Sequence, residues 1–414
     1  MSAALSSALR SAIRRAAAHR EAARYIDAGL TLQAAWIALE RAGRLDSLDA
    51  ADVYVALAEL ERAARNWLRG EPFAREALRL RMARLSASDR AVTRAQVLLA
   101  DLLVRQRRLA EAETLVTRAL TAMDQRTSAS DLDLADALEV LAAVRLRQRR
   151  HTLAEAQWLA ALGLRAAQPR PDRARIAATG LGLAAVYGAT GRRAAAIEVQ
   201  QNALAALRRL RGRRHPDVAH VLLDLATRLR ADGQREAAAT AKAEARRILD
   251  TVNAVNPHGV AKTGTINPFA VNYRVETRES AIHHLGVFAR QAIPAWRKVI
   301  EYTGERISKQ ESGRRWDPER SYLFELTSRT HLDGAIGGSG AEYINHSCDP
   351  NIKTRIVRGH ILYYSQRAIR AGEELTVDYR YDHDSDRMTC YCGSPACRGT
   401  MNLPPPKRRR RTKR

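Results

Sequence analysis

The sequence predicts a multidomain protein in which an all-α helical-repeat solenoid is followed by a smaller, mostly-β domain. Three observations predict this fold class. Pairs of small and apolar residues recur every 42 positions through the first 250 residues, short strand-like runs replace that period after residue 275, and all four cysteines lie in the last 70 residues. A chain of 414 residues is also too long for a single hydrophobic core.

The repeat is visible in two columns that advance together by 42 residues. One column is the pair Leu-Ala, at Leu57-Ala58, Leu99-Ala100, Leu141-Ala142, Leu183-Ala184 and Leu225-Ala226. The other is a single alanine, at Ala77, Ala119, Ala161, Ala203 and Ala245. Each period reads as two amphipathic helices joined by a short polar turn, for example 91–105 and 109–121. We therefore expect about five helix pairs over 45–250, preceded by an N-terminal helical segment at 1–44.

The last period opens with His215-Pro216-Asp217-Val218-Ala219, which is similar to the start of a kinesin-light-chain-type repeat. Residues 45–250 thus resemble a tetratricopeptide (TPR) array. The resemblance implies stacked helix pairs whose concave face docks a protein partner. The arginine-rich helix faces are expected to be solvated surface.

The composition is basic, with a net charge of +24 and only seven lysines among 69 basic residues. Such a charge favours polyanions or acidic partners, but an arginine-rich, lysine-poor chain is also typical of a GC-rich, bacterial genome. No run of 18 uncharged apolar residues predicts a membrane span. The N-terminus lacks the apolar core of a Sec signal; it resembles either an amphipathic first helix, which we favour, or a mitochondrial presequence.

After Asp250 the helical period stops. Residues 251–274 contain Asn-Pro twice and predict a linker or a domain-entry loop. Strand-like runs follow at 299–302, 322–326, 360–364 and 375–379. The domain from about 275 to 403 is therefore expected to be mostly β.

Three of the cysteines form the cluster C-Y-C-G-S-P-A-C, at Cys390, Cys392 and Cys397. Three thiolates leave one position of a tetrahedral zinc site open, and Cys348 is the one other cysteine that could fill it. Two disulfides are the alternative, but no secretory signal supports an oxidising compartment. The pattern favours structural zinc.

Five motifs in order resemble the SET-domain lysine methyltransferases: H-L-G-V-F-A (284–289), I-E-Y-T-G-E (300–305), Y-I-N-H-S-C-D-P-N (343–351), A-G-E-E-L-T-V-D-Y (371–379) and C-Y-C-G-S-P-A-C-R-G (390–399). The last is similar to the post-SET zinc segment. The resemblance implies a SET domain at 275–383, a post-SET segment at 384–403 and S-adenosylmethionine as methyl donor.

The same resemblance implies roles for single residues. Tyr379 corresponds to the catalytic tyrosine, while Tyr302 and, less closely, Tyr381 correspond to tyrosines of the lysine channel. The cofactor is expected to contact Tyr379, the side chain of Asn345, the main chain of His346, and the turn that corresponds to the family's G-x-G, made here by His284, Leu285 and Gly286.

Several positions depart from the family pattern. His284 replaces the first glycine of G-x-G, so that turn must adopt a conformation that a side chain tolerates. Trp296 stands where the family usually has glycine, before the strand that leads to Tyr302. Glu342 stands where an arginine is common, which reverses a charge beside the cofactor strand. Val377 occupies the place of a Phe or Tyr that influences methylation degree, so the degree stays open. His284 and Glu342 raise the question of cofactor affinity.

The chain closes on three prolines and K-R-R-R-R-T-K-R, so 404–414 is expected to be a basic arm that resembles a nuclear-import signal or a nucleic-acid tether. The sequence thus predicts a nuclear histone-lysine methyltransferase, with a cytoplasmic location as the alternative. If the chain is bacterial, the prediction becomes an effector delivered to a host nucleus. The rival functions are methylation of a non-histone basic protein and an interaction scaffold whose SET domain has lost turnover.

Overall fold

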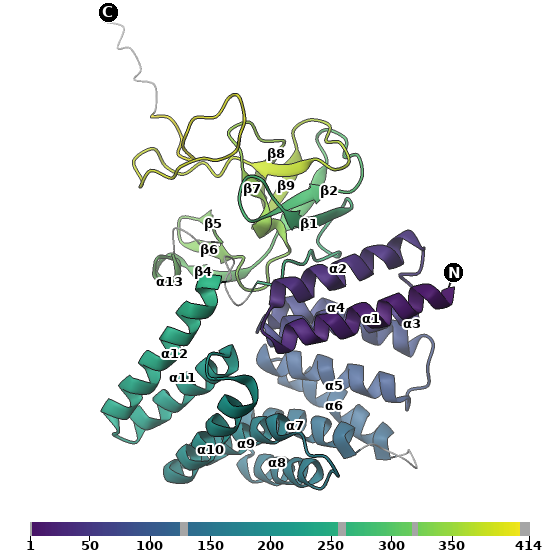
Figure 1. Ribbon diagram of the computed structural model, residues 1–414, viewed down its shortest axis with the longest axis vertical. Coiled ribbons are helices and arrows are strands. Elements are labelled where there is room, and N and C mark those ends of the chain that lie inside the picture. Colours follow the sequence, from purple (N-terminus) through teal and green to yellow (C-terminus); the bar gives the residue numbers. More distant parts are fainter. Residues whose placement is uncertain (1, 125–130, 256–261, 317–321, 406–414) are drawn as a thin grey trace, which may run out of the picture. The chain divides into compact units, whose positions relative to one another are not determined.

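A computed structural model describes residues 2–124, 131–255, 262–316 and 322–405 (Figure 1). The chain divides into two compact units, Met1–Thr263 and Gly264–Arg414. The basic stretch 407–414, predicted to be an import signal, lies outside the described residues. Among those that are described, no helix has the length and apolar character needed to cross a membrane.

The first unit is an array of paired helices. Each odd-numbered helix packs against the helix that follows it, and each pair packs against the next pair. In the described part of the chain the helices are α1 (Ser2–Glu21), α2 (Tyr25–Arg41), α3 (Leu48–Ala63), α4 (Trp67–Met82), α5 (Arg90–Arg105), α6 (Leu109–Asp124), α7 (Asp131–Arg147), α8 (His151–Ala166), α9 (Arg173–Ala189), α10 (Arg193–Arg211), α11 (Pro216–Ala231) and α12 (Arg235–Val255).

The 42-residue columns mark the buried contacts between these helices. The Leu-Ala pairs fall at one register of α3, α5, α7, α9 and α11, and every member is at most 8% exposed. The alanine column falls on the even-numbered helices, where Ala77, Ala119, Ala161 and Ala245 are fully buried. A methyl group at these sites lets two helix backbones approach closely, so the predicted α-solenoid is confirmed.

A third column appears only in the backbone. The turn within each helix pair contains a residue with positive φ, again at intervals of 42 residues, namely Ala23, Arg65, Arg107, Arg149, Gly191 and Gly233. Only the last two are glycines, the residue that takes this conformation at no steric cost. Because the column reaches back to Ala23, the pair α1–α2 repeats the geometry of the later pairs.

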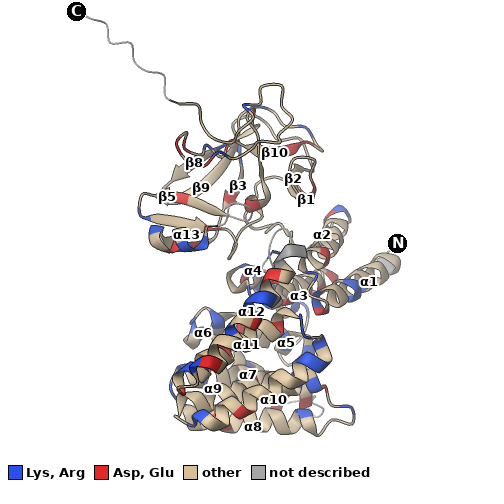
Figure 2. Cartoon of the chain, turned by 60° about the vertical axis from the view of Figure 1, so that its left-hand side comes forward, with Lys and Arg blue, Asp and Glu red and all other residues tan. Residues whose placement is uncertain are grey.

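Basic and acidic residues both occur along the helices of this unit (Figure 2). Many arginines pair with a carboxylate roughly one repeat away along the chain. Examples are Arg62 with Asp101 at 3.4 Å, Arg108 with Glu71 at 2.6 Å and Arg192 with Glu155 at 2.5 Å. A large share of the positive charge therefore lies in exposed, ion-paired helix faces.

The first helix also touches the sixth pair. The ring of His215 caps α11 by accepting the backbone N–H of Asp217 at Nδ1 (3.1 Å). Its Nε2 lies 3.3 Å from the carbonyl oxygen of Glu21, at the end of α1, and the Glu21 carboxylate forms an ion pair with Arg211. Since Nδ1 accepts, Nε2 carries the proton and donates to that carbonyl. The end of α1 and the start of α11 are thus joined by residues that lie 194 positions apart in the chain.

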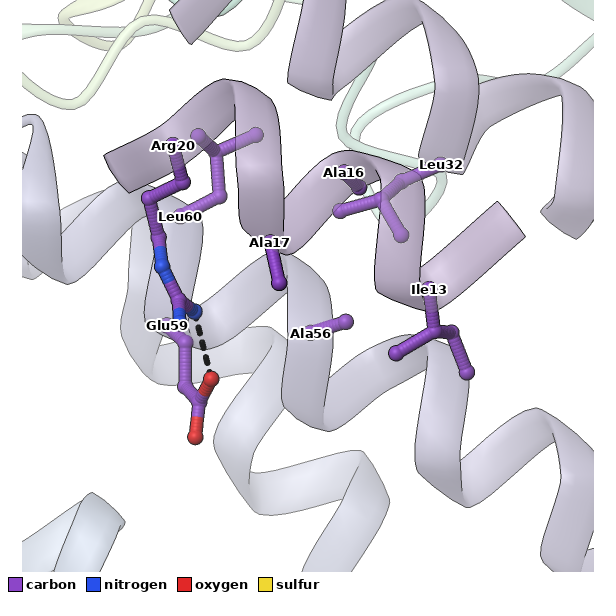
Figure 3. Close-up of a pocket in the computed structure, with 8 residues that line it drawn as sticks. All are labelled: Ile13, Ala16, Ala17, Arg20, Leu32, Ala56, Glu59 and Leu60. Atoms are coloured by element: carbon purple, nitrogen blue, oxygen red, sulfur yellow. Dashed lines mark hydrogen bonds and ion pairs between the residues drawn. The ribbon is translucent and has the colours of Figure 1, made fainter. Parts of the chain in front are cut away.

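A small cavity lies between α1, α2 and α3, lined by Ile13, Ala16, Leu32, Leu60 and other side chains (Figure 3). An ion pair between Arg20 and Glu59 lies at its edge. Its volume of about 20 Å³ can hold a single water molecule and no larger ligand.

In the described residues of the second unit there are three small sheets, one short α-helix, α13 (Lys309–Arg315), and one 3-10 helix, η1 (Ala341–Tyr343). Its sheets have the strand orders β1-β2-β10-β7, β3-β9-β8 and β4-β6-β5. The strands, within the described residues, are β1 (Val275–Glu279), β2 (Leu285–Ala289), β3 (Lys298–Tyr302), β4 (Glu305–Ser308), β5 (Leu323–Thr327), β6 (Thr330–Asp333), β7 (Asn345–His346), β8 (Ile352–Val357), β9 (His360–Ser365) and β10 (Glu374–Val377). The predicted mostly-β domain is confirmed.

The stretch predicted to be a linker is partly structured. Helix α12 extends to Val255, and residues 264–267 pack on the segment that leads into β7. The backbone N–H of Gly264 donates to the Tyr343 hydroxyl at 2.9 Å, and that of Asn267 donates to the carbonyl of Ser339 at 2.8 Å. These bonds support the strand that carries the Asn-His pair.

Candidate active site and metal centre

Two of the quoted motifs meet in one sheet. Strand β10 pairs in parallel with the short strand β7, so that Thr376 lies opposite Asn345 and Val377 opposite His346. Parallel pairing brings the ends of both strands to the same edge of the sheet. Tyr379, two residues beyond the end of β10, therefore lies beside the Asn-His pair.

Asn345 fastens the predicted cofactor turn to β7. Its buried amide Nδ2 lies within hydrogen-bonding distance of the Leu285 carbonyl (3.1 Å) and of the Glu374 carboxylate (2.9 Å). Glu374 also accepts the hydroxyl of Ser280 at 2.8 Å, which holds the residue in front of the turn. A Cβ at Gly286 would collide with the Glu374 carboxylate, so a larger residue here would force Glu374 to move away from Asn345 and Ser280. Ser280 and Glu374 were not predicted, although Glu374 lies inside a quoted motif.

The two turns in which a side chain replaces glycine keep a glycine-like backbone. His284 has φ +42° and Trp296 has φ +62°, both in the left-handed region that side chains rarely adopt. The expectation that the His284 turn would adopt a conformation that side chains tolerate well is not met. Both side chains are exposed, Trp296 by 62%. The Lys353 ammonium lies 4.3 Å from the centroid of the Trp296 ring, and the His284 ring packs edge-on against that of His283 at 4.0 Å.

Tyr302 ends β3 inside an aromatic cluster. Its ring centroid lies 5.4 Å from that of Phe324 and 6.3 Å, edge-on, from that of Tyr363. Its hydroxyl donates to the carbonyl of Tyr322 at 2.5 Å. Burial, then the neighbouring Tyr363 and the buried Glu342, raise the pKa of Tyr302 well above its usual range. Tyr302 is thus a neutral hydroxyl in an aromatic wall.

Tyr379 has a comparable arrangement at the edge of the sheet. Its hydroxyl donates to the carbonyl of Ile344 at 2.9 Å, while its ring packs edge-on against Tyr381 (5.9 Å) and His346 (5.3 Å). Tyr379 is 39% exposed and Tyr381 is 36% exposed. Because the hydroxyl points inward, burial raises the pKa of Tyr379, with Tyr381 and Tyr363 adding to the shift. This residue therefore offers a reachable ring face and a neutral hydroxyl.

Sequence reasoning missed part of this aromatic wall. Phe324 and Tyr363 lie in runs that were interpreted only as strands, where an aromatic residue is typical of ordinary sheet packing. Glu342, the residue whose charge is reversed, folds back on its own turn and accepts the backbone N–H of Gly340 at 2.7 Å. Val377 is buried in β10, opposite His346.

The four cysteines gather into one cluster, with their sulfur atoms all within 4.8 Å of one another. Cys348 Sγ lies 3.7 Å from Cys390 Sγ and 4.0 Å from Cys397 Sγ. Four sulfurs at 2.3 Å from a tetrahedral zinc ion would be about 3.8 Å apart. All four cysteines are free rather than disulfide-bonded. The donor set and spacing fit zinc, as predicted, with Cys348 as the fourth ligand.

The charge state of the cluster also suits a metal. Burial opposes ionisation of the Cys392 thiol, but hydrogen bonds from the backbone near Cys348 and Ser394 and from neighbouring thiols lower its pKa to about 6. Metal ligation requires the thiolate form.

His346 lies between the cysteine cluster and the D-Y motif. Its side chain is 1% exposed, its Nε2 is 3.5 Å from Cys348 Sγ, and its Nδ1 accepts the backbone N–H of Tyr379 at 3.1 Å. Burial, opposed by Asp378 and aided by Arg398, lowers the pKa of His346 to about 4, so the ring is neutral at pH 7. The prediction for this residue concerned its main chain; the contacts of its ring were not predicted.

Comparisons with known proteins agree with this anatomy. Residues 284–380 match the SET domain family model and residues 175–251 match a tetratricopeptide repeat model. A histone-lysine N-methyltransferase of Saccharomyces cerevisiae, H3 lysine-4 specific, is 39% identical over 136 residues, which are 30% of this chain and 13% of that protein. The corresponding Schizosaccharomyces pombe enzyme is 40% identical over 133 residues, 30% of this chain and 14% of the relative. Histone-lysine N-methyltransferase ATX2 of Arabidopsis thaliana is 36% identical over 140 residues, 31% and 12% of the two chains.

The similarity thus spans about an eighth of the length of these relatives. The SET match, 284–380, lies within the second unit and contains four of the five quoted motifs. A SET domain implies S-adenosylmethionine as cofactor, and the four cysteines suit zinc. The chain therefore carries a SET domain, followed by a post-SET-type cysteine cluster and preceded by a tetratricopeptide-repeat region.

Proposed function

We propose that the protein is an S-adenosylmethionine-dependent protein-lysine N-methyltransferase that acts on histones. The observation that carries the proposal is the position of Tyr379, whose neutral hydroxyl lies at the edge of the β10–β7 pair beside Asn345 and His346. Asn345 already fixes the turn 283–286 to that same edge.

The bound cofactor would supply an electrophilic methyl group, held by the turn His284–Gly286, by Asn345 and by the main chain of His346. What this chain must provide is an uncharged lysine amine in line with that methyl group. Deprotonating a lysine of pKa near 10.4 at pH 7 costs about 4.6 kcal/mol. An aromatic channel lowers that cost, because it removes the ammonium form from water.

The hydroxyls of Tyr302 and Tyr379 are suited to orient the amine. Each donates its proton to a backbone carbonyl, of Tyr322 and of Ile344 respectively. Each therefore keeps an oxygen lone pair that can accept an N–H of the substrate amine. With its N–H groups held in this way, the amine directs its own lone pair toward the methyl donor. Tyr381 would extend the channel wall beside Tyr379.

Histones as substrate and the nucleus as location are supported by the printed names of the relatives, which are histone-lysine N-methyltransferases. The basic tail 404–414 points the same way. The repeat array would dock a protein partner or the substrate on its concave face.

The test is transfer of a labelled methyl group from S-adenosylmethionine to core histones. Tyr379→Phe should lower kcat at least tenfold, while the control Tyr391→Phe, a tyrosine that is 67% exposed, should leave it unchanged. Mass spectrometry of the product identifies the lysine and the degree of methylation. Absence of transfer to histones and to other basic proteins at saturating cofactor would refute the proposal.

A second function is favoured by the backbone of His284 and Trp296. Two strained positions, one in the cofactor turn and one before β3, are what a domain that has lost turnover accumulates while serving as an interaction scaffold. Calorimetry separates the two functions, because a scaffold that no longer holds the cofactor should not bind S-adenosylmethionine.

A further inference from the structure

The ring of His346 has two nitrogen atoms, and each faces a different site. Nδ1 accepts the backbone N–H of Tyr379 at 3.1 Å. A backbone N–H can only donate, so Nδ1 carries no proton and the proton of the imidazole lies on Nε2. That N–H is 3.5 Å from Cys348 Sγ, within range for donation to sulfur.

The described neighbours of the ring offer it no further hydrogen bond. The Asp378 carboxylate lies 3.6 Å from Nδ1, which carries no proton that it could donate. The guanidinium of Arg398 binds this carboxylate instead, with two hydrogen bonds of 2.9 Å. The ring of Tyr379 packs edge-on against the imidazole, at a centroid distance of 5.3 Å. With a side chain that is 1% exposed, His346 has no water-facing edge to satisfy.

We propose that the His346 imidazole is a positioning residue that joins the metal cluster to Tyr379, with Nε2–H donating to the Cys348 thiolate and Nδ1 accepting the Tyr379 backbone N–H. The first bond orients a metal ligand, as outer-shell hydrogen bonds do at many metal sites. The second fixes the backbone from which the Tyr379 ring extends. The catalytic meaning of the second bond rests on the proposed methyltransferase function, whereas the first bond does not.

Two substitutions separate the two bonds. The terminal atoms of asparagine reach the place of Nδ1, so His346→Asn keeps an acceptor for Tyr379 and loses the donor to Cys348. The terminal amide of glutamine reaches the place of Nε2, so His346→Gln keeps a donor to Cys348 and loses the acceptor. His383→Asn and His383→Gln, at an exposed histidine of the same unit, are matched controls.

The experiment measures three quantities on the full chain with zinc bound. These are the rate at which zinc is released to a colorimetric chelator, the hydrogen-exchange rate of the peptide containing Tyr379, and kcat for histone methylation. His346→Asn should release zinc at least tenfold faster, with near-normal exchange at Tyr379. His346→Gln should release zinc at nearly the wild-type rate, exchange faster at Tyr379 and lower kcat at least tenfold with little change in KM.

Zinc release and hydrogen exchange report on the two bonds even if the chain transfers no methyl group, so failure of the proposed function and failure of this inference are distinguishable. Unchanged zinc release in His346→Asn overturns the bond to Cys348, and unchanged exchange in His346→Gln overturns the bond to Tyr379. If both variants change zinc release, hydrogen exchange at Tyr379 and kcat to the same extent, or if both unfold, the ring has a general structural role and the proposal is wrong.

Discussion

Arg398 donates two parallel hydrogen bonds of 2.9 Å to the carboxylate of Asp378, the residue that directly precedes Tyr379. Its own backbone N–H points to Cys348 Sγ at 3.4 Å. Arg398 therefore contacts both the cysteine cluster and the residue next to Tyr379, the proposed catalytic tyrosine. A planar fork is needed for this geometry, and lysine cannot reproduce it.

We expect Arg398→Lys to keep the charge but lose the paired bonds, so that the segment 384–403 detaches more often from β10. Hydrogen exchange in that segment should become faster and kcat should fall several-fold, because the Tyr379 backbone loses one support. Zinc content should stay at one ion per chain. Arg387→Lys, at an arginine outside this network, is the control; an equal effect of both variants would count against the assignment.

Removal of Cys348 should release the metal. Cys348→Ser replaces a thiolate by a hydroxyl that stays protonated near pH 7, so one of four ligands is lost and the C-terminal segment unfolds. Elemental analysis should find one zinc ion per wild-type chain and much less than one in the variant. Tyr391→Phe, between two ligands but exposed, should retain the metal. Full zinc content in Cys348→Ser would show that the other three cysteines bind it without Cys348.

His284→Gly should relieve the left-handed backbone at φ +42°. A side chain in this region costs the folded state about 1–2 kcal/mol. Glycine also gains conformational freedom in the unfolded chain, so the free energy of unfolding should rise by only roughly half of that amount. Calorimetry should show S-adenosylmethionine binding at least as tightly as in the wild type, because the turn keeps its shape. Weaker binding by the glycine variant would mean that the imidazole itself contacts the cofactor.

Arg149→Gly should stabilise the repeat unit. Arg149 is exposed and has φ +62°, whereas Gly191, at the same place in the next repeat, has φ +79° and no atom within 4 Å of the point where a Cβ would lie. We expect the free energy of unfolding to rise by about 0.5–1 kcal/mol in Arg149→Gly and to fall by a similar amount in Gly191→Arg. Urea unfolding followed by circular dichroism measures both; changes of the same sign would contradict the explanation.

The repeat unit should also lose stability in mild acid. Burial, then the charge of Arg65, lower the pKa of His220 to about 4, with Asp217 opposing and His215 adding to the shift. The unfolded chain binds this proton near pH 6.5, so the contribution is present above pH 6.5 and is lost as the pH falls toward 4. Partial exposure limits the loss to about 2 kcal/mol. In His220→Gln the difference in urea midpoint between pH 7.5 and pH 5 should become smaller than in the wild type. An unchanged difference would mean that groups other than His220 cause the loss of stability in acid.

The sequence was sufficient to predict features that repeat or that lie in short motifs. Leu99-Ala100 and its equivalents predict the array because each repeat obeys the same packing rule, and the spacing of Cys390, Cys392 and Cys397 predicts a metal site because coordination geometry is local. Tyr302 and Tyr379 follow from the resemblance, and their roles stay predictions.

What could not be predicted depends on contacts between residues far apart in the chain. The bond between Asn345 and Glu374, the ring of His346 between two sites, and Tyr363 in the aromatic wall all depend on which strands become neighbours. The left-handed φ of His284 was missed for another reason. The surrounding strands fix the turn, and their packing outweighs the local preference of the side chain.

The contact of Glu21 with Arg211 and His215 changes how the first unit should unfold. In an open array each helix pair is held only by its neighbours, so the terminal pairs fray first and the loss spreads inward. Fastening the first helix to the sixth pair removes that free end. Local unfolding must then begin at an internal helix pair or break the contacts of Glu21 with Arg211 and His215. Deletion of residues 1–24 would restore fraying at both ends of the array.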